Sequence, residues 1–310
     1  MTERPPATLR RRVVYPGAVV DGRRLRPNPS VRWRRRVQSL LVSRPEREEA
    51  ELEGLLRTQP APSRPNTVTV VSPKGGVGKT TSTFLLGDAL ASHLKLRVVA
   101  VDANPDFGTL AALAPDAARC ERSLADLFAD LDHVRTATGV RGYVSALPSG
   151  LHVLAAPRDP EMMGQFGPDS YGQLLAFLAL YYDVVLLDLG TGLTAPLARF
   201  ALSRSDQVLL VTTPEWVTSS IVVDALEHLR QIEHDRFTVV ANRYYGRRLG
   251  QLRALEEALR QQRLPRRVAL PYDEQLAAML DSGTYSLAAL ERPTRMSIKR
   301  LALLVAELLA

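Results

Sequence analysis

The chain has 310 residues, 45% of them hydrophobic, which is enough apolar material for one substantial core. Its single cysteine, Cys120, excludes an internal disulfide and favours a reducing, cytoplasmic compartment. No apolar run approaches the length of a transmembrane helix, and the arginine-rich beginning lacks the apolar stretch of a secretory signal.

The formal net charge of +7 is concentrated at the start of the chain. Residues 1–65 hold 15 arginines and 7 acidic residues, which gives +8, whereas the remainder is close to neutral at −1. Prolines and glycines interrupt this segment, so we expect a basic, partly disordered extension and a Pro-rich linker, with short helices over 31–41 and 46–56. Its arginines suit nucleic acid, anionic lipid or an acidic partner, and a solvated tail without a partner is an equal alternative.

A strand, a glycine-rich turn and a helix come next. The β-type run 67–71 leads into S-P-K-G-G-V-G-K-T-T at 72–81, and leucines and alanines then repeat at helical spacing over 80–94. Backbone N–H groups and the helix dipole at such a junction bind phosphate, and glycines let the backbone approach it closely. The P-loop pattern G-x-x-x-x-G-K-[ST] matches, except that Pro73 holds the place of the first glycine.

This pattern gives each residue of the turn an expected role. Lys79 should reach the β- and γ-phosphates of a nucleotide, and the Thr80 hydroxyl should ligate Mg²⁺. A glycine-rich turn without a ligand is the alternative, but such a turn needs fewer glycines. The remaining residues expected to cradle the nucleotide are Gly75, Gly76, Val77, Gly78 and Thr81.

Two further apolar strands end in aspartates. The run 96–101 ends at Asp102, and the run from 183 ends at Asp188. Parallel strands place catalytic groups at their carboxyl ends, so we expect Asp102 in the Mg²⁺ and water shell and Asp188 to hold Mg²⁺ directly or through water. For Asp102 the alternative is a helix N-cap. Gly190, just beyond the second strand, is placed where its N–H could sense the γ-phosphate.

The other elements complete an alternating pattern. It predicts an α/β fold, a mostly parallel twisted sheet flanked by helices, over 66–310. We expect a loop over 158–170 and a turn with a short strand over 139–147, and no role can be assigned to 112–170. The remaining expected strands are 152–156, 207–212, 237–241 and 268–270, and the remaining helices are 124–131, 171–182, 219–233 and 296–310.

The octapeptide K-G-G-V-G-K-T-T resembles the deviant Walker A motif of the ParA/MinD family of P-loop ATPases, and the resemblance covers about 66–310. In that family the first lysine reaches the partner's phosphates across an ATP-sandwiched dimer. The resemblance therefore implies ATP and Mg²⁺ as cofactors and a homodimer, with Lys74 as the residue that makes ATP binding and dimerisation one event.

The resemblance also implies the hydrolytic residues. The segment after Asp102 is similar to the family's D-x-D switch, whose second aspartate is associated with hydrolysis, but this chain has Asn104. An amide can hydrogen-bond the attacking water but cannot accept its proton. We therefore expect slow hydrolysis, or a carboxylate supplied by Asp106 or by a partner. Thr191 and Gly192 also differ from the family's switch residues, so its conformational coupling stays open.

Residues that contact the base follow from the same resemblance. In relatives an asparagine at the end of the strand matching 237–241 recognises adenine, which implies this role for Asn242. Pro271 and Asp273 resemble the family's nucleotide-side loop.

A basic strip follows Asn242. In ParA-like ATPases, basic residues in this part of the chain bind DNA without sequence preference, through salt-sensitive phosphate contacts. The alternative is a solvated helix face. The arginines of the strip are Arg243, Arg247, Arg248, Arg253, Arg260, Arg263, Arg266 and Arg267.

These observations favour an ATP-dependent dimerisation switch in DNA partitioning, reset by slow, partner-stimulated hydrolysis. One alternative is a MinD-like positioning or secretion-associated ATPase that acts at the membrane or on a protein complex. Another is a weakly or non-hydrolysing ATP-binding scaffold, suggested by Asn104. A lipid-binding role for the last helix is a weaker expectation than its docking on the sheet. The location is expected to be cytoplasmic, with association to the nucleoid or the membrane surface left open.

Overall fold

The computed structural model describes residues 19–20, 23–24, 44–104, 108–231, 236–246, 249–263 and 266–309. The chain divides into two units, 1–50 and 51–310. In the first unit, β1 and β2 form a two-stranded antiparallel pair; their bounds are Val19–Val20 and Arg23–Arg24. The predicted helix over 31–41 and most of the arginine-rich extension lie outside the described residues.

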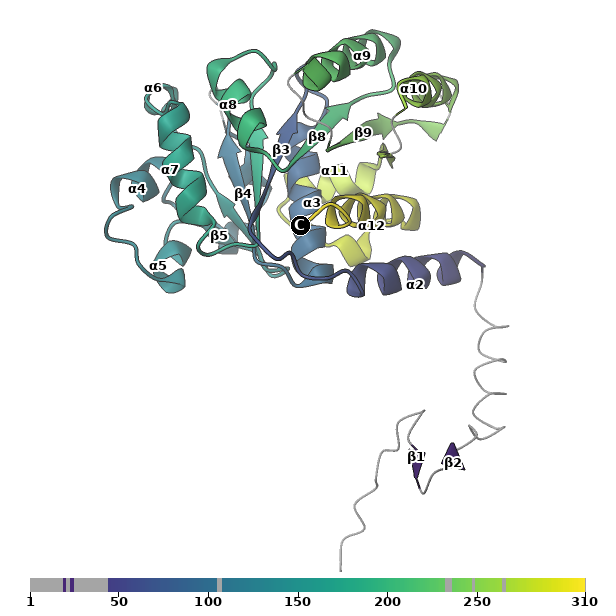
Figure 1. Ribbon diagram of the computed structural model, residues 1–310, viewed down its shortest axis with the longest axis horizontal. Helices are drawn as coiled ribbons and strands as arrows, with labels where there is room; N and C mark the ends of the chain where they lie inside the picture. The colour runs from purple at the N-terminus through teal and green to yellow at the C-terminus, as the bar shows by residue number, and fades with distance from the viewer. Residues whose placement is uncertain are drawn as a thin grey trace, which may run out of the picture. The chain divides into compact units, whose positions relative to one another are not determined.

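The second unit is built on an eight-stranded sheet with the order β10-β9-β8-β3-β7-β4-β6-β5 (Figure 1). Neighbouring strands pair in parallel, except that β5 runs antiparallel to β6. The predicted mostly parallel α/β sheet is confirmed. The strands are β3 (Asn66–Val71), β4 (Val98–Ala103), β5 (Ser145–Ala146), β6 (Leu151–Leu154), β7 (Val184–Leu189), β8 (Gln207–Thr212), β9 (Phe237–Tyr244) and β10 (Arg267–Pro271).

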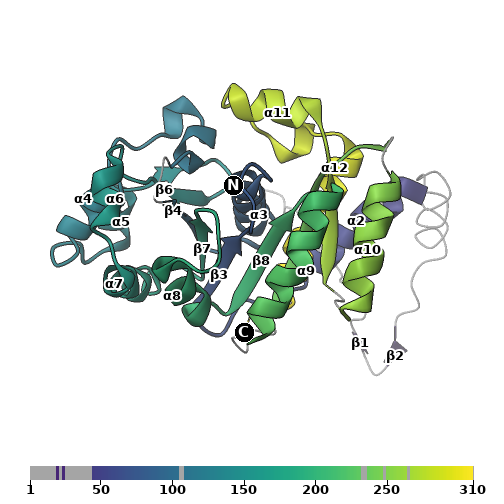
Figure 2. The ribbon, with the colours of Figure 1, turned by 90° about the horizontal axis from the view of Figure 1, so that it is seen from above.

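Helices cover both faces of this sheet, as the view from above shows (Figure 2). One face is covered by α3 (Lys79–Leu94), α11 (Glu274–Asp281), α12 (Arg292–Ala306) and the part of α2 (Arg44–Arg57) that belongs to the second unit, with the short 3-10 helices η1 (Leu110–Leu113), η2 (Asp116–Ala118) and η4 (Leu287–Ala289) in the connections. The other face is covered by α4 (Leu124–Ala129), α5 (Ala137–Arg141), α6 (Pro160–Gly164), α7 (Pro168–Leu178), α8 (Pro196–Arg204), α9 (Trp216–Gln231) and α10 (Leu249–Gln261).

The apolar runs of the strands are explained by this double cover. Successive residues of β4 enter opposite cores: Val98 and Ala100 pack on the α3 side, whereas Val99 and Val101 pack on the α7 side. A parallel strand buried on both faces reads as a continuous apolar run rather than an alternating one. Each fully buried valine or leucine contributes about 1.5–3 kcal/mol, so the central strands fix the position of everything at their carboxyl ends.

Two segments predicted as a loop or a turn contain short helices, and the helices α8 and α11 were not predicted. The expected loop over 158–170 contains α6, which begins where the Asp159 carboxylate accepts a hydrogen bond from Glu161 N (2.9 Å). The expected turn at 139 lies inside α5, which Thr136 caps by accepting from Gly139 N (3.0 Å). Short helices of about one turn have too few residues to show a period, so their caps are the stronger sequence signal.

The last helix, α12, is docked on the sheet. Its apolar side packs with α3 and β10, and the buried residues include Ile298, Leu301 and Val305. Lys299 is 3% exposed and its Nζ donates to Glu53 Oε1 of α2 (2.6 Å). Across the described part of the chain, no helix combines the length and apolar character needed to span a membrane.

Candidate nucleotide site

The P-loop joins β3 to α3. Gly76 and Gly78 have φ angles of 73° and 90°, left-handed values that glycine adopts without strain. No side chain caps α3, so the N–H groups of its first turn keep their capacity for an external anion. A Cβ on Gly78 would lie 2.2 Å from Asn242 Nδ2, so this glycine also makes room for the end of β9. The loop therefore has the geometry of a phosphate cradle.

Ser72 ties the start of the P-loop to the loop after β7. Its hydroxyl donates to Lys74 O (2.8 Å), and its backbone oxygen accepts from Gly192 N (3.2 Å). Gly192 has a φ of 93°, and the Thr191 methyl group would be 3.4 Å from a Cβ on Gly75. The predicted γ-phosphate sensor segment, from Gly190 onward, is thus in direct contact with the P-loop.

Asp188 lies near the carboxyl end of β7, close to Lys79 and Thr80 of the P-loop. It is 1% exposed, and burial raises the pKa of its carboxyl group to about 7, although the nearby Thr80 hydroxyl and the Lys79 ammonium favour the ionised form. Burial likewise lowers the pKa of Lys79, and Asp188 opposes that shift. Neither carboxylate oxygen of Asp188 forms a hydrogen bond of standard geometry with the described residues, although the Thr80 and Thr83 hydroxyls lie close enough to lower its pKa. A buried carboxylate without such bonds is costly, and a bound cation would offset that cost.

The donor set at this point fits Mg²⁺. A carboxylate and a threonine hydroxyl are hard oxygen ligands, which Mg²⁺ prefers. No group of three or more His, Cys, Asp and Glu side chains suited to a metal occurs among the described residues. Such a site resembles those in which Mg²⁺ is held by one or two protein oxygens together with substrate phosphates and water.

Asp102 lies beside Asp188 but has different neighbours. The two are register partners on β4 and β7. Asp102 Oδ2 accepts from Leu110 N (2.9 Å) and Oδ1 from Asn104 N (3.3 Å). Burial raises its pKa, and these two bonds oppose the shift. Gly108 closes over it, since a Cβ there would lie 2.5 Å from Asp102 Oδ2. Asp102 therefore braces the chain that follows β4, while Asp106 lies outside the described residues.

Lys74 lies at the exposed side of the P-loop. Its Nζ donates to the hydroxyl of Thr218 on α9 (3.3 Å), and Thr218 itself is fully buried. In a single chain the lysine therefore leans across its own loop towards α9. Its contact with the phosphates of a second chain stays a prediction.

Asn242 connects the end of β9 to the P-loop. Its Nδ2 donates to Val77 O (2.8 Å), and its Oδ1 accepts from Arg243 N (2.9 Å). The Arg243 guanidinium donates to Gly76 O (3.1 Å). An amide side chain has two donor hydrogens and two acceptor lone pairs, so Asn242 keeps one of each for a base.

Sequence reasoning missed an aromatic pair beside Asn242. Tyr245 and Tyr272 follow the ends of the neighbouring strands β9 and β10, and their rings stack with centroids 4.8 Å apart at 28°. They are 43% and 41% exposed, so one face of the stack is open to solvent. Tyr272 N donates to Tyr244 O (2.9 Å), which fixes the pair on the sheet edge. Two tyrosines after adjacent parallel strands were the signal that could have revealed it.

Pro271 and Asp273 flank Tyr272. Pro271 ends β10, whereas Asp273 caps α11 by accepting from Leu276 N (3.0 Å). The same carboxylate accepts from the Thr294 hydroxyl (2.6 Å). Both carboxylate oxygens of Asp273 are therefore used in hydrogen bonds within the protein. Pro271 directly precedes Tyr272, one of the two stacked tyrosines.

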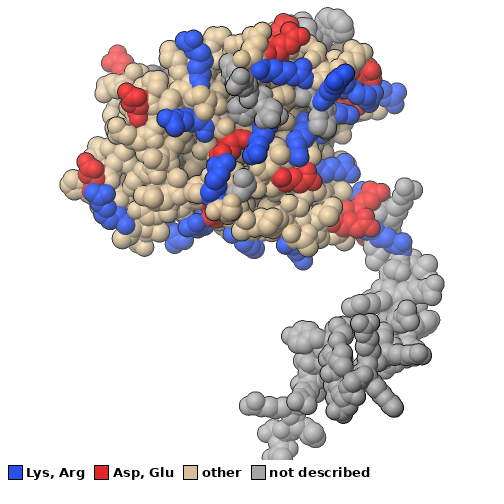
Figure 3. Space-filling view, viewed as in Figure 1, with Lys and Arg blue, Asp and Glu red and all other residues tan. Residues whose placement is uncertain are grey.

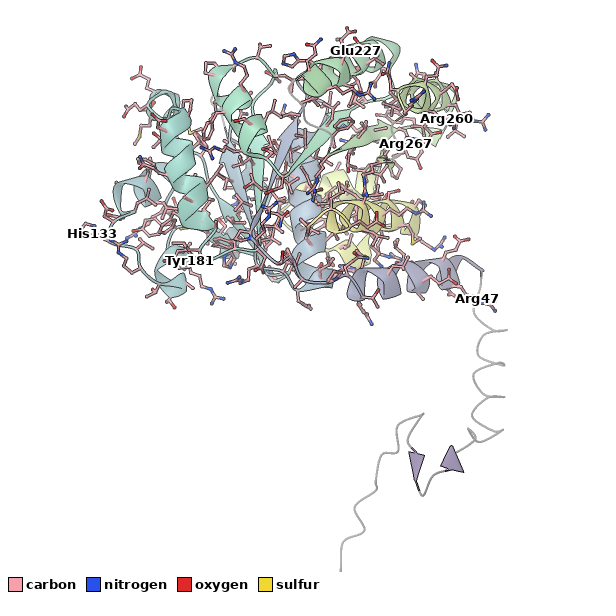
Figure 4. The ribbon with its side chains drawn as sticks, viewed as in Figure 1. Arg47, His133, Tyr181, Glu227, Arg260 and Arg267 are labelled. Carbon is pink, nitrogen blue, oxygen red and sulfur yellow. The ribbon has the colours of Figure 1, made fainter. Side chains whose placement is uncertain are left out.

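The basic strip divides between several locations. Arg243 faces the P-loop at the carboxyl end of β9. Arg266 lies at the opposite end of the sheet, just before the amino end of β10, and donates to Leu304 O (2.9 Å). Arg260 pairs with Glu257 and projects outward from α10 (Figure 4). At the α10 end of the face in Figure 3, basic side chains are mixed with acidic ones. Arg247 and Arg248 lie outside the described residues; Arg253, Arg263 and Arg267 complete the strip.

Together, the parallel sheet, the P-loop and the acidic strand end define a P-loop nucleotide-binding protein. The family model described as "AAA domain" matches residues 65–239. The chain is 30% identical over 259 residues to the ESX-1 secretion-associated protein EspI of Mycobacterium tuberculosis, a match that covers 79% of this chain and 38% of EspI. This chain thus spans well under half of that relative's length.

Solved structures agree on the fold. A ParA family ATPase from Chlorobium tepidum superimposes with a TM-score of 0.63 at 20% identity, covering 77% of this chain and 98% of that one. The septum site-determining protein MinD of Pyrococcus horikoshii, complexed with Mg-ADP, gives 0.62 at 22% identity, covering 76% and 94%. The chain belongs to the ParA/MinD family of P-loop ATPases.

Proposed function

We propose that this protein is an ATP-dependent dimerisation switch, with residues 66–310 as the ATPase domain and 1–65 as a basic extension. The observation that carries this proposal is the buried Asp188 carboxylate, which lies beside Lys79 and the Thr80 hydroxyl and forms no hydrogen bond of standard geometry with the described residues. A fold that leaves a buried anion without such bonds gains stability from a cation bound there.

Each residue of the proposed site has one task. The P-loop N–H groups and Lys79 hold the β- and γ-phosphates, and Thr80 and Asp188 hold Mg²⁺. Bound Mg²⁺ would neutralise charge on the phosphate oxygens. Lys74 leaves Thr218 to reach the phosphates of a second chain, because its side chain is the exposed cation of the loop.

The base is proposed to stack on the exposed face of the Tyr245–Tyr272 pair, with Asn242 hydrogen-bonding its edge. A base stacked on an aromatic side chain contributes about 1–3 kcal/mol. Tyr272→Ala should therefore weaken ATP binding about 5- to 150-fold while leaving the affinity for inorganic tripolyphosphate unchanged. An equal loss for both ligands would show that the tyrosine acts on the P-loop and not on the base.

Hydrolysis is proposed to be slow. Asn104 cannot accept a proton from the attacking water, and the Asp102 oxygens already accept backbone N–H groups. An activating partner protein that supplies a carboxylate, or positions water, would raise the rate. Without such a partner the protein acts as an ATP-bound scaffold.

We propose a protein complex, as in secretion, as the target of the switch. The similarity to the secretion-associated EspI over 79% of this chain supports this choice. Non-specific DNA is the second candidate, supported by the exposed Arg253, Arg260 and Arg263 on and beside α10. The arginines of the strip are divided between the carboxyl and the amino ends of the strands, which favours a protein complex over DNA as the target. Because α12 is docked on the sheet, the membrane is a weaker, third candidate.

The proposal is tested by the mass of the full chain in solution with ATP–Mg²⁺, with ADP–Mg²⁺ and without nucleotide. We expect a dimer with ATP–Mg²⁺ alone, which Lys74→Ala abolishes while ATP still binds. A monomer with every nucleotide, or dimers unchanged by Lys74→Ala, would contradict it. A gel-shift series with duplex DNA and increasing salt then separates the two targets, since ATP-dependent, salt-sensitive binding would select DNA.

A further inference from the structure

A cavity of about 330 Å³ lies at the amino ends of the strands, away from the P-loop. It opens between the end of α3, helix α5, the turn before β6 and the connection from α7 to β7. The strands β4 and β6 begin at its floor, with Val98 and Leu151 as register partners, whereas the nucleotide site lies at the strands' carboxyl ends. The two sites are therefore separated by the length of the sheet.

Positive charge dominates the lining of this cavity. Lys95, Arg97 and Arg141 contribute to its wall, and none of its described lining residues is acidic. Arg97 is held by Asp183, whose carboxylate also accepts Arg97 N (2.8 Å). Lys95 and Arg141 are exposed and form no ion pair with another described residue. Two cations at a concave surface thus keep their charge for an external anion.

The rest of the wall is apolar and aromatic. Leu96, Val98 and Val140 line it together with the ring of Tyr181, which lies close to α5 in Figure 4. His152 Nδ1 and the Tyr182 hydroxyl are hydrogen-bonded (2.8 Å), and their rings meet edge to face. Burial and the nearby Arg141 lower the pKa of His152, which disfavours the charged form of its ring. The wall therefore pairs a cationic rim with a largely uncharged interior.

We propose that this cavity binds a small organic anion with a flat apolar body, such as an aromatic carboxylate or sulfonate. Its volume lies in the range of pockets that enclose small molecules, which combine apolar walls with a few fixed polar groups. Inorganic phosphate would leave the apolar wall uncovered, and a neutral ligand would leave Lys95 and Arg141 unpaired. The aromatic body would pack on Tyr181 while the acid group faces Arg141.

The test uses the full chain with saturating ADP–Mg²⁺ and the probe 8-anilinonaphthalene-1-sulfonate. Its uncharged analogue, N-phenyl-1-naphthylamine, is titrated in parallel. Arg141→Glu should weaken binding of the sulfonate about tenfold or more, because the substitution replaces an attractive charge by one that repels the sulfonate group. The affinity for the uncharged analogue should stay unchanged. Arg135→Glu is the matched control: Arg135 is exposed, lies just before α5 and does not line the cavity.

Two further measurements locate the probe. The chain has five histidines, so the His152 ring resonance can be assigned with His152→Gln and should shift on titration with the sulfonate. Ala137→Trp, at an exposed lining position, should fill the cavity and abolish the shift without changing its charge. Equal effects of Arg141→Glu and Arg135→Glu, an unmoved His152 resonance, or no binding to the wild type would each overturn the proposal.

Discussion

The carboxyl ends of β4 and β7 lie side by side, and each has a buried aspartate as its second-last residue, but the two aspartates have different neighbours. Asp102 accepts two backbone N–H groups from the chain that returns to Leu110. Asp188 accepts no backbone N–H group and no hydrogen bond of standard geometry from the described residues; only the Thr80 and Thr83 hydroxyls lie near it. Backbone N–H groups thus hold the Asp102 carboxylate in place, whereas no backbone group holds the Asp188 carboxylate.

The difference originates in the segment that leaves each strand. After β4 the chain folds back over Asp102, and Gly108 allows its backbone to come within contact of the carboxylate. After β7 the chain leaves through Gly190 towards the P-loop, where Gly192 N donates to Ser72 O (3.2 Å). Burial alone therefore does not distinguish the two aspartates; the absence of backbone donors at Asp188 does.

Removing the Lys79 ammonium, which lies beside Asp188, should have the largest effect, a loss of ATP affinity. Lys79→Ala takes away the half-buried ammonium that lies near Asp188 and the proposed phosphates, so ATP affinity should fall about 30- to 5,000-fold, as expected when one partner of a charge pair is removed. Lys74→Ala is the matched control in the same loop and should retain ATP binding. Isothermal titration calorimetry measures the ATP affinity of both variants. Normal ATP binding by Lys79→Ala would contradict the role of Lys79 in holding the phosphates.

The pH dependence of stability should separate Asp188 from the other carboxyl groups. Its pKa is raised from 3.8 to about 7 by burial, so between these values the folded state binds more protons than the unfolded state. Stability therefore falls as pH rises from about 4 to about 7, by up to about 4 kcal/mol from this group. Denaturant unfolding in Mg²⁺-free buffer should show this fall in the wild type.

Asp188→Asn is the control for that measurement, because it removes the titrating group while keeping its size. The variant should be more stable than the wild type near pH 7 and should lose most of the slope. Asp102, whose pKa is also raised by burial, accounts for the remaining slope. Identical slopes for both proteins would mean that Asp188 is already satisfied in the absence of metal.

A substitution at Gly108 should test how closely the following chain packs over the carboxyl end of β4. A Cβ there would lie 2.4 Å from Ala156 Cβ and 2.5 Å from Asp102 Oδ2, so Gly108→Ala should destabilise the fold by about 1–3 kcal/mol. Gly250→Ala, on α10 with nothing within 4 Å, should be neutral or stabilising by about 0.4–1 kcal/mol. Thermal and denaturant unfolding report both, and a neutral Gly108→Ala would show that the β4 end is not closely packed.

The smallest effect is expected from Asn104→Asp. A carboxylate at this position can accept the proton of the attacking water, so turnover should rise about tenfold, which corresponds to about 1.4 kcal/mol in the barrier. Asn104→Ala is the matched control and should not accelerate the reaction. Unchanged phosphate release in Asn104→Asp would remove Asn104 as the cause of slow hydrolysis.

Much of the fold was predictable because the central strands are buried on both faces. The runs ending at Asp102 and Asp188 read as continuous apolar segments, and the glycine-rich turn after β3 has a spacing with few alternatives. The predicted strand over 207–212 coincides with β8. Short elements such as α5 and α6 were missed because one helical turn shows no period.

Contacts between distant parts of the chain could not be predicted. The bond from Asn242 Nδ2 to Val77 O spans 165 positions and depends on the sheet order that places β9 near the P-loop. The stacking of Tyr245 on Tyr272 likewise requires β9 and β10 to be neighbours. Local patterns identify such residues one at a time, and topology decides which of them meet.

The most direct test is the effect of Mg²⁺ on ATP affinity, measured by calorimetry with Mg²⁺ and with EDTA for the wild type, Asp188→Asn and Asp102→Asn. We predict that Mg²⁺ tightens ATP binding to the wild type and to Asp102→Asn but not to Asp188→Asn. If Asp188→Asn retains the full Mg²⁺ effect, or if a folded Asp102→Asn loses it, the metal site does not lie at the open end of β7 and the account is contradicted.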